Sequence, residues 1–181
     1  MNTENSKTPN EELGRMKKED YHNAEKIPVV VILDNVRSLN NVGSIFRTCD
    51  AFRVESIYLC GHTGTPPNKE ISKTALGATD TVEWKYFKAT LESINYLRER
   101  NFKIYAIEQT KNSIMLDKMN LESSEKIALI FGNEVYGVDQ EIINVSDASI
   151  EIPQYGSKHS LNVSVSAGIV LWEVSKKYFN L

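Results

Sequence analysis

Three short stretches of the sequence bring asparagine, arginine, glutamate and serine side chains together with glycines. They are DNVRSLNNVGSIFR at 34–47, FGNEVYGV at 131–138 and IPQYGSKHSLNVS at 152–164. Gly, Asn and Ser let a backbone turn tightly and present its amide groups to a ligand. The chemistry predicted for the three stretches is therefore the binding of a ligand through backbone amides.

The familiar phosphate-binding and hydrolytic motifs do not fit these stretches. Gly132 and Gly137 have the spacing of a P-loop, but Val138 and Asp139 stand where that motif requires Lys and Ser or Thr. No GxGxxG follows the first predicted strand, which disfavours a dinucleotide-binding Rossmann site. Ser160 follows a histidine in the chain, but this adjacency does not make a Ser-His-Asp triad.

Apolar patterns predict the elements that position the three stretches. Runs of apolar residues predict strands at 27–33, 55–60, 81–87, 103–108, 126–131 and 148–153. Apolar residues at helical spacing predict helices at 41–52, 70–78, 88–100, 137–145 and 160–178. Strands that alternate with helices predict an α/β fold with a mostly parallel sheet and helices on both faces.

All three stretches follow predicted strands, so a parallel sheet would bring them to one edge. Ligands of open α/β sheets bind at the loops that leave the carboxyl ends of the strands. The stretches are therefore predicted to form one site. In the last predicted helix, the spacing of Leu161, Val165, Ile169 and Trp172 predicts the stripe that faces the core.

Each candidate residue also has an ordinary structural explanation. Asn41 could cap the helix that begins there, and Ser160 could cap the last helix with Asn162 in its first turn. Glu134 could be a favourable anion at a helix N-terminus, and Arg47 could be a solvated helix arginine. These explanations suffice one at a time, but they do not explain why all five residues fall at one predicted edge of the sheet.

Composition sets wider limits on the function. The chain has 181 residues and a net charge of −3, which does not indicate a nucleic-acid-binding protein, although a local basic patch would suffice for one. Two cysteines and three histidines lack the spacing of metal ligands, so reduced thiols and no metal are expected.

The chain is expected to consist of two parts. Residues 1–26 are polar and are predicted to form a flexible N-terminal arm with a short helix around 11–18, followed by one domain at 27–181. The arm does not resemble a signal peptide, and the longest apolar run, at 27–33, is too short to cross a bilayer. A cytoplasmic protein without a membrane partner is therefore expected.

In their order and spacing, the three stretches resemble the motifs of the SpoU/TrmH family of RNA ribose 2′-O-methyltransferases, within the SPOUT superfamily. The family motifs are similar to Asn-x-Gly-x-x-x-Arg, Gly-x-Glu-x-x-Gly and Ile-Pro-x-x-Gly-x-x-x-Ser-Leu-Asn-Val-Ser, and 41–47, 132–137 and 152–164 match them without a gap. KTALGA at 73–78 also resembles a family segment. The resemblance implies that the α/β fold contains a C-terminal trefoil knot, the α/β knot of SPOUT proteins.

The resemblance also implies a cofactor and roles for residues. The family uses S-adenosyl-L-methionine, and Gly132, Ile152 and Leu161 should line its pocket, with a contribution from the loop at 59–64. Family members are homodimers whose active site is completed across the interface, and the last helix is the expected interface element. The positions that match the family's catalytic or ordering residues are Asn41, Arg47, Glu134, Ser160 and Asn162.

The reaction implied is methyl transfer to the 2′-hydroxyl of a ribose in structured RNA. The RNA expected is tRNA, at a guanosine, with rRNA as the rival, because 26 polar residues cannot form the N-terminal RNA-binding domain of some family members. A guanidinium keeps its proton in proteins, so Arg47 is expected to grip an adjacent phosphate with its rigid fork. Glu134 is expected to orient Arg47 or a protein amide.

Three other functions stay open at this point. A knotted methyltransferase could act on a base, although the full set of matched Asn, Arg and Ser-Leu-Asn residues favours ribose. A catalytically silent RNA-binding module would have no chemical need for the matched Asn, Arg and Glu residues together. A small-ligand Rossmann-type binder is disfavoured by the missing glycine fingerprint.

Overall fold

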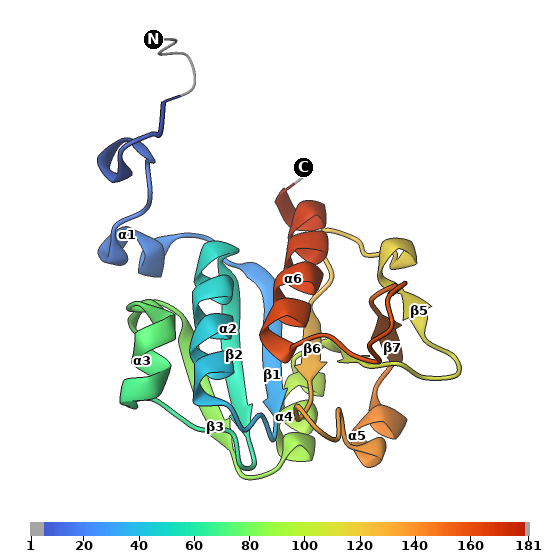
Figure 1. Cartoon of the computed structure of the whole chain (residues 1–181). Coiled ribbons are helices and arrows are strands. Elements are labelled where there is room, and N and C mark those ends of the chain that lie inside the picture. The colour runs from blue at the N-terminus through green and yellow to red at the C-terminus, as the bar shows by residue number, and fades with distance from the viewer. Residues whose placement is uncertain (1–5, 180–181) are drawn as a thin grey trace.

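The computed structural model describes residues 6–179 and is built around one parallel sheet of seven strands (Figure 1). The order of the strands across the sheet is β3-β2-β1-β6-β4-β7-β5. Their bounds are β1 Ile27–Asp34, β2 Val54–Cys60, β3 Glu83–Phe87, β4 Lys103–Ile107, β5 Ile114–Met115, β6 Ile127–Phe131 and β7 Ala148–Glu151.

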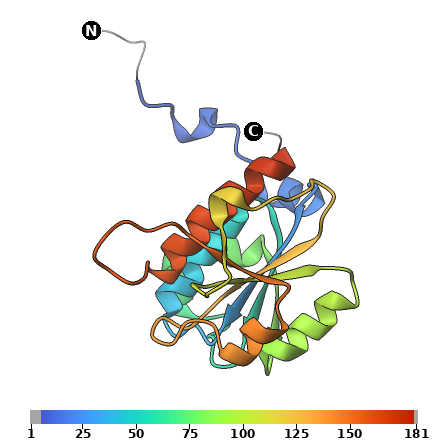
Figure 2. The same cartoon turned by 90° about the vertical axis from the view of Figure 1, so that its right-hand side faces the viewer.

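Helices cover both faces of this sheet, as Figure 2 shows from the side. Helices α2, α3 and α6 lie on one face, and α4 and α5 lie on the other. The bounds of the α-helices are α1 Lys18–Asn23, α2 Leu39–Ala51, α3 Lys69–Ala75, α4 Thr90–Arg98, α5 Gln140–Val145 and α6 Val163–Phe179. Three single 3₁₀ turns are η2 Asn10–Glu12, η3 Ala78–Asp80 and η4 Leu116–Lys118.

Strand β1 shows why the sequence forms a two-sided sheet. Val29, Val31 and Leu33 are fully buried in the core that α2 and α6 complete. Val30 and Ile32 are fully buried in the core beneath α4 and α5. Successive side chains of a strand point to opposite faces, so an uninterrupted apolar run is buried on both sides. The predicted α/β fold with a parallel sheet and helices on both faces is confirmed.

The strand order creates the place for a ligand site. From β1 the chain builds outward through β2 and β3, and it then crosses to the other side of β1, where β6 lies between β1 and β4. Every strand pair is parallel, so the carboxyl ends of β1, β4, β6 and β7 share one edge. Such a reversal of strand order is where open α/β sheets bind ligands.

The elements near the N-terminus differ from the prediction. The helix expected around 11–18 is absent from these residues, because Gly14 adopts a left-handed conformation (φ 60°) just after the η2 turn. A helix forms later, as α1, and it buries Tyr21 in the core of the domain, where that side chain is 4% exposed. The division into an arm and a domain at residue 26 stays a prediction, as does the trefoil knot.

The buried stripe of α6 was predicted wrongly. Leu161, Val165, Ile169 and Trp172 are between 38% and 51% exposed. The apolar side chains that α6 buries are Val163, Ala167, Val170, Leu171 and Val174. Two apolar stripes at helical spacing run along this helix, and periodicity does not decide between them. The small side chain of Ala167 suits the stripe that packs between the sheet and α2.

Gly43, the glycine of the first stretch, allows α2 to pack closely against α3. A Cβ atom at this position of α2 would lie 2.2 Å from the backbone oxygen of Ile71 in α3. We expect Gly43→Ala to cost about 1–3 kcal/mol by overpacking and to lower the melting temperature by several degrees. Thermal unfolding followed by circular dichroism would measure this shift.

Asn95→Ala is the control for this substitution. Asn95 is an exposed residue of α4, on the opposite face of the sheet. Alanine has a higher helix propensity than asparagine, so this variant should melt no lower than the wild type. Equal melting temperatures for Gly43→Ala and the wild type would contradict the packing argument.

Candidate active site

A cavity of about 690 Å³ opens at the carboxyl edge of the sheet, among the loops that follow β4, β6 and β7. Its wall includes Gly132, Ile152 and Leu161, the three residues predicted to line a cofactor pocket. Its volume lies within the range usual for cofactor and small-ligand sites. The structure thus brings the second and third stretches to one cavity.

Backbone rather than side chains forms the part of this wall that follows β6. A Cβ atom at Gly132 would lie 2.1 Å from the carbonyl carbon of Gly137, so only glycine allows the two segments to touch. Gly137 itself has a φ of 70°, which disfavours other residues. The backbone groups of Asn133 and Gly137 exchange two hydrogen bonds of 2.9 Å that close the loop. The glycines thus let the loop after β6 close on itself at the cavity wall.

Two residues after β4 brace this cavity and were not predicted. The Glu108 carboxylate accepts a hydrogen bond from the amide of Val138 at 3.1 Å. The side-chain amide of Gln109 donates to the carbonyl oxygen of His159 at 2.7 Å. Both line the cavity and tie β4 to the second and third stretches. Their position at the end of the predicted strand 103–108 and directly after it was the signal that could have found them.

Glu134 connects the second stretch to the first. Its carboxylate accepts hydrogen bonds of 2.9 Å from the amides of Arg37 and Ser38 and from the side-chain amide of Asn41. Partial burial acts to raise the pKa of Glu134, but the hydrogen bonds from these three donors outweigh it and lower the pKa below its ordinary value. Of the two targets expected for Glu134, the structure shows the protein amides.

Asn41 and Asn162 extend this connection to the third stretch. The side-chain amide of Asn162 donates to the side-chain oxygen of Asn41 at 3.2 Å. The side-chain oxygen of Asn162 accepts from the amide of Ser164 at 2.9 Å, as an N-cap residue does. Asn162 therefore precedes α6 and caps it, which corrects the prediction that Ser160 is the cap. In α2 the N-cap is Ser38, so Asn41 does not have the capping role suggested for it.

Ser160 and Arg47 have different relations to this site. Ser160 is exposed and lines the cavity. Arg47 lies six residues beyond Asn41 on α2, which is about 240° around the helix and about 9 Å along it. It is exposed, lines neither of the two cavities described here, and makes no side-chain hydrogen bond or ion pair with residues 6–179. Within one chain, Arg47 does not join the hydrogen-bonded group of Glu134, Asn41 and Asn162.

The loop at 59–64 does not line this cavity, contrary to expectation. It follows β2, which lies on the opposite side of β1 from β6. The loop therefore reaches a different part of the same edge, where His62 lines a second and smaller cavity.

Residues 6–179 contain no group of three or more His, Cys, Asp or Glu residues placed to hold a metal ion. Cys49 and Cys60 are both buried and free. No helix within these residues has the length and apolar character needed to cross a membrane.

Comparison with known proteins agrees with this geometry. Residues 28–172 match the SpoU rRNA Methylase family. The chain is 32% identical over 149 residues to a tRNA (guanosine(18)-2′-O)-methyltransferase of Thermus thermophilus, covering 82% of this chain and 75% of the relative.

Two solved structures are similar to the whole domain. The TrmH/SpoU tRNA modifying enzyme of A. aeolicus superposes with a TM-score of 0.78 at 30% identity, covering 90% of this chain and 81% of that one. The AdoMet-bound rRNA methyltransferase of Sinorhizobium meliloti has a TM-score of 0.77 at 27% identity, covering 87% and 60%. With the three motif stretches gathered at one cavity and a family match over most of its length, the chain belongs to the SpoU methylase family.

Proposed function

We propose that this protein transfers the methyl group of S-adenosylmethionine to the 2′-hydroxyl of a ribose in tRNA, in the cytoplasm. The observation that carries the proposal is the hydrogen-bonded connection of Glu134, Asn41 and Asn162 beside the glycine-lined cavity. The T. thermophilus relative, whose name gives tRNA guanosine as its substrate, supports the choice of RNA.

Different residues of the chain have different roles in this reaction. When bound, S-adenosylmethionine would supply its methyl group to the ribose 2′-oxygen, leaving S-adenosylhomocysteine, while the hydroxyl proton passes to water or a neighbouring oxygen. Gly132, Ile152 and Leu161 would hold the cofactor at the cavity wall. Glu134 fixes the start of α2 through Arg37 and Ser38, so the loop beside the reacting atoms stays rigid. Rigid positioning of two reactants can supply a large part of the rate enhancement in such a transfer.

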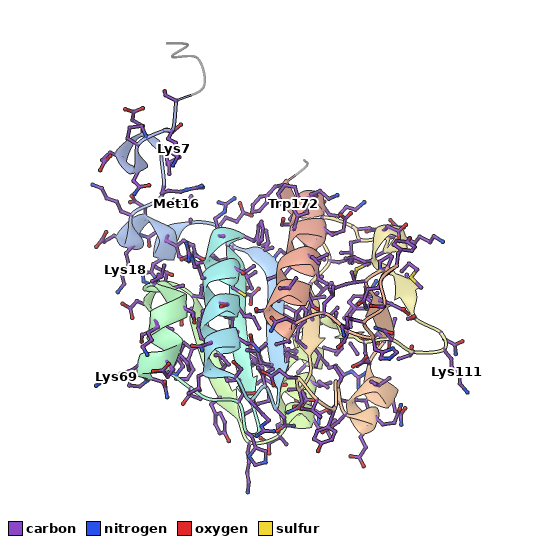
Figure 3. All side chains as sticks on the ribbon, viewed as in Figure 1. Lys7, Met16, Lys18, Lys69, Lys111 and Trp172 are labelled. Carbon is purple, nitrogen blue, oxygen red and sulfur yellow. The ribbon has the colours of Figure 1, made fainter. Side chains whose placement is uncertain are left out.

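Arg47 supplies the phosphate grip in this proposal, and it does so from a second copy of the chain. The exposed stripe of α6, with Val165, Ile169 and Trp172, is the apolar surface that two copies would bury. Figure 3 shows Trp172 on α6, and its ring lies 6.1 Å from that of Phe52, which follows α2. A dimer through α6 would thus involve the helix that bears Arg47 and would place this residue near the partner's cavity.

We expect Trp172→Glu to convert a dimer into a monomer. The substitution places a charge within the exposed apolar stripe of α6, where a partner helix would have to desolvate it. Light scattering coupled to size-exclusion chromatography would measure the mass. Leu91→Glu, at an exposed apolar residue on the opposite face of the sheet, is the control and should leave the mass unchanged. A monomeric wild type would contradict the dimer.

The reaction itself is tested by labelling. Purified protein is incubated with radiolabelled S-adenosylmethionine and with tRNA or rRNA that lacks its own modifications. Label in tRNA at one nucleotide that resists alkaline cleavage is the expected result, since a 2′-O-methyl group blocks attack by the 2′-oxygen. Label in rRNA alone would show that the substrate is rRNA and not tRNA. Label on an alkali-sensitive nucleotide would indicate a base methyltransferase. Cofactor binding without any label would favour the silent RNA-binding module.

A further inference from the structure

A second cavity, of about 370 Å³, opens beside the first at the same edge of the sheet. Asn133 and Tyr136 line both cavities, so a molecule in the second would lie next to the cofactor pocket. The residues that line the second cavity are Asn35, Arg37, His62, Asn133, Tyr136 and Asp139.

The side chains of the two asparagines that line this cavity form hydrogen bonds that hold its loops together. Asn35 donates from its side chain to Asp34 and accepts from the amide of His62, both at 3.0 Å. Asn133 donates from its side chain to the carbonyl oxygen of Asn35 at 2.8 Å and accepts from the amide of Val135 at 2.9 Å. These amides fix the three loops after β1, β2 and β6 against one another.

The other four lining side chains carry polar groups without partners. Arg37, His62, Tyr136 and Asp139 are exposed, and their side chains make no hydrogen bond or ion pair with residues 6–179. Tyr136 is 82% exposed at the tip of its loop, so its ring contributes little to the core. Asp139 is the residue before α5, yet its side chain does not cap that helix. The cavity therefore combines a rigid frame with an aromatic face, two cationic or donor groups and one carboxylate.

We propose that this cavity binds a guanine base of the RNA substrate, an inference that rests on the proposed function. The Tyr136 ring offers a face on which a base can stack, as aromatic side chains do in single-stranded RNA recognition. The Asp139 carboxylate accepts from the adjacent ring N–H and amino group of guanine. Arg37 and His62 donate to the acceptors of guanine, its O6 and N7 atoms.

The carboxylate of Asp139 discriminates between possible ligands of the second cavity. An isolated phosphate would be repelled by Asp139, although Arg37 and His62 alone would attract it. Adenine presents an acceptor where guanine presents its ring N–H, so Asp139 would face a lone pair. Of the two purines, guanine is the one whose donors and acceptors both find partners in this wall.

Short RNAs test the subsite without requiring methyl transfer. The probes are fluorescently labelled trinucleotides UGU and UAU, whose binding to the full chain is followed by anisotropy in the presence of S-adenosylhomocysteine. Wild-type protein should bind UGU more tightly than UAU. Tyr136→Ala should weaken UGU binding about five- to a hundredfold, and Tyr136→Phe should retain most of it, because stacking needs only the ring. Asp139→Asn should reduce the preference for UGU about tenfold.

Two controls show that these effects arise in the second cavity. Leu91→Ala removes an exposed apolar side chain on α4 that lines neither cavity, and it should leave both affinities unchanged. Calorimetric titration with S-adenosylhomocysteine should give the same affinity for Asp139→Asn as for the wild type, because Asp139 lines the second cavity and not the first. A loss of cofactor affinity in this variant would overturn the proposal, because Asp139 would then act through the first cavity.

The remaining outcomes separate the subsite from the proposed function. Equal binding of UGU and UAU, or a Tyr136→Ala variant that binds like the wild type, would overturn the guanine subsite even if the protein methylates RNA. Guanine-dependent binding that requires Tyr136, combined with no methylation of tRNA or rRNA, would uphold the subsite and contradict the proposed reaction.

Discussion

Arg47→Ala is expected to lower kcat/KM for RNA methylation by about a hundredfold or more, while the melting temperature stays that of the wild type. Arg47 is exposed and makes no side-chain hydrogen bond or ion pair with residues 6–179, so its removal should leave folding intact. Loss of a group that positions a reacting phosphodiester can cost about a hundredfold in rate. Single-turnover methyl transfer and thermal unfolding on the same preparations would measure both quantities.

Arg47→Lys separates two roles for this side chain. A lysine keeps the positive charge but lacks the planar fork that binds a phosphate through two parallel hydrogen bonds. The Lys variant should therefore remain close to the Ala variant in rate. If Lys restores most of the activity, the charge alone is sufficient and the fork has no special role.

A mixing experiment tests whether Arg47 acts on the partner's cavity. Arg47→Ala chains are co-refolded or co-expressed with Glu134→Gln chains, each of which should keep about a tenth of the wild-type activity or less on its own. Half of a random mixture of dimers is mixed, and each mixed dimer has one site with an intact cavity and an intact Arg47 from the other chain, so about a quarter of wild-type activity should return. No recovery would indicate that Arg47 serves the cavity of its own chain.

Glu134→Gln is expected to lower kcat/KM by about ten- to a hundredfold and the stability by about 1 kcal/mol. The carboxylate accepts from three N–H groups in the first stretch, and a neutral amide has one oxygen to offer them. For a domain of this size the stability loss is about 2–4 °C in melting temperature. Glu141→Gln, at an exposed glutamate of α5 without such partners, is the control and should change neither quantity.

The direction of the pKa shift of Glu134 predicts how the stability difference between the wild type and Glu134→Gln changes with pH. The pKa of Glu134 is lowered in the folded chain, so its carboxylate stabilises the fold above the ordinary pKa of glutamate. That stabilisation is lost as the pH falls through the lowered pKa. The difference in unfolding free energy between the wild type and Glu134→Gln should be full at neutral pH and should shrink below about pH 4.3. A difference that grows in acid would contradict the assignment.

Much of the architecture could be predicted from local patterns. The uninterrupted apolar run of β1 indicated a strand buried on both faces, and the structure shows Val30 and Val31 fully buried in opposite cores. The short β5 was not predicted, because two residues carry no periodicity. The stripe of α6 was assigned to the wrong side, because Ile169 and Ala167 both lie on apolar stripes of correct spacing.

The residues of the candidate site could be predicted from the sequence, but their arrangement in space could not. The glycine, asparagine and serine residues in the loops after strands could be identified from the sequence. Because the strands were predicted to be parallel, these loops were also predicted to meet at one edge of the sheet. The partners of Glu134 could not be read in this way, because Asn41 lies 93 residues earlier in the chain. The bracing contacts of Glu108 and Gln109 depend likewise on β4 lying beside β6.

The sequence by itself determined the succession of strands and helices and the motif that marks the family, because apolar spacing and motif residues are local properties of the chain. Only the tertiary structure decided that β6 lies between β1 and β4, that Asn162 caps α6 while Glu134 holds the start of α2, and that Arg47 lies apart from both. These relations arise from contacts between residues far apart in the chain, whose energies depend on how whole elements pack and not on the spacing within any one of them.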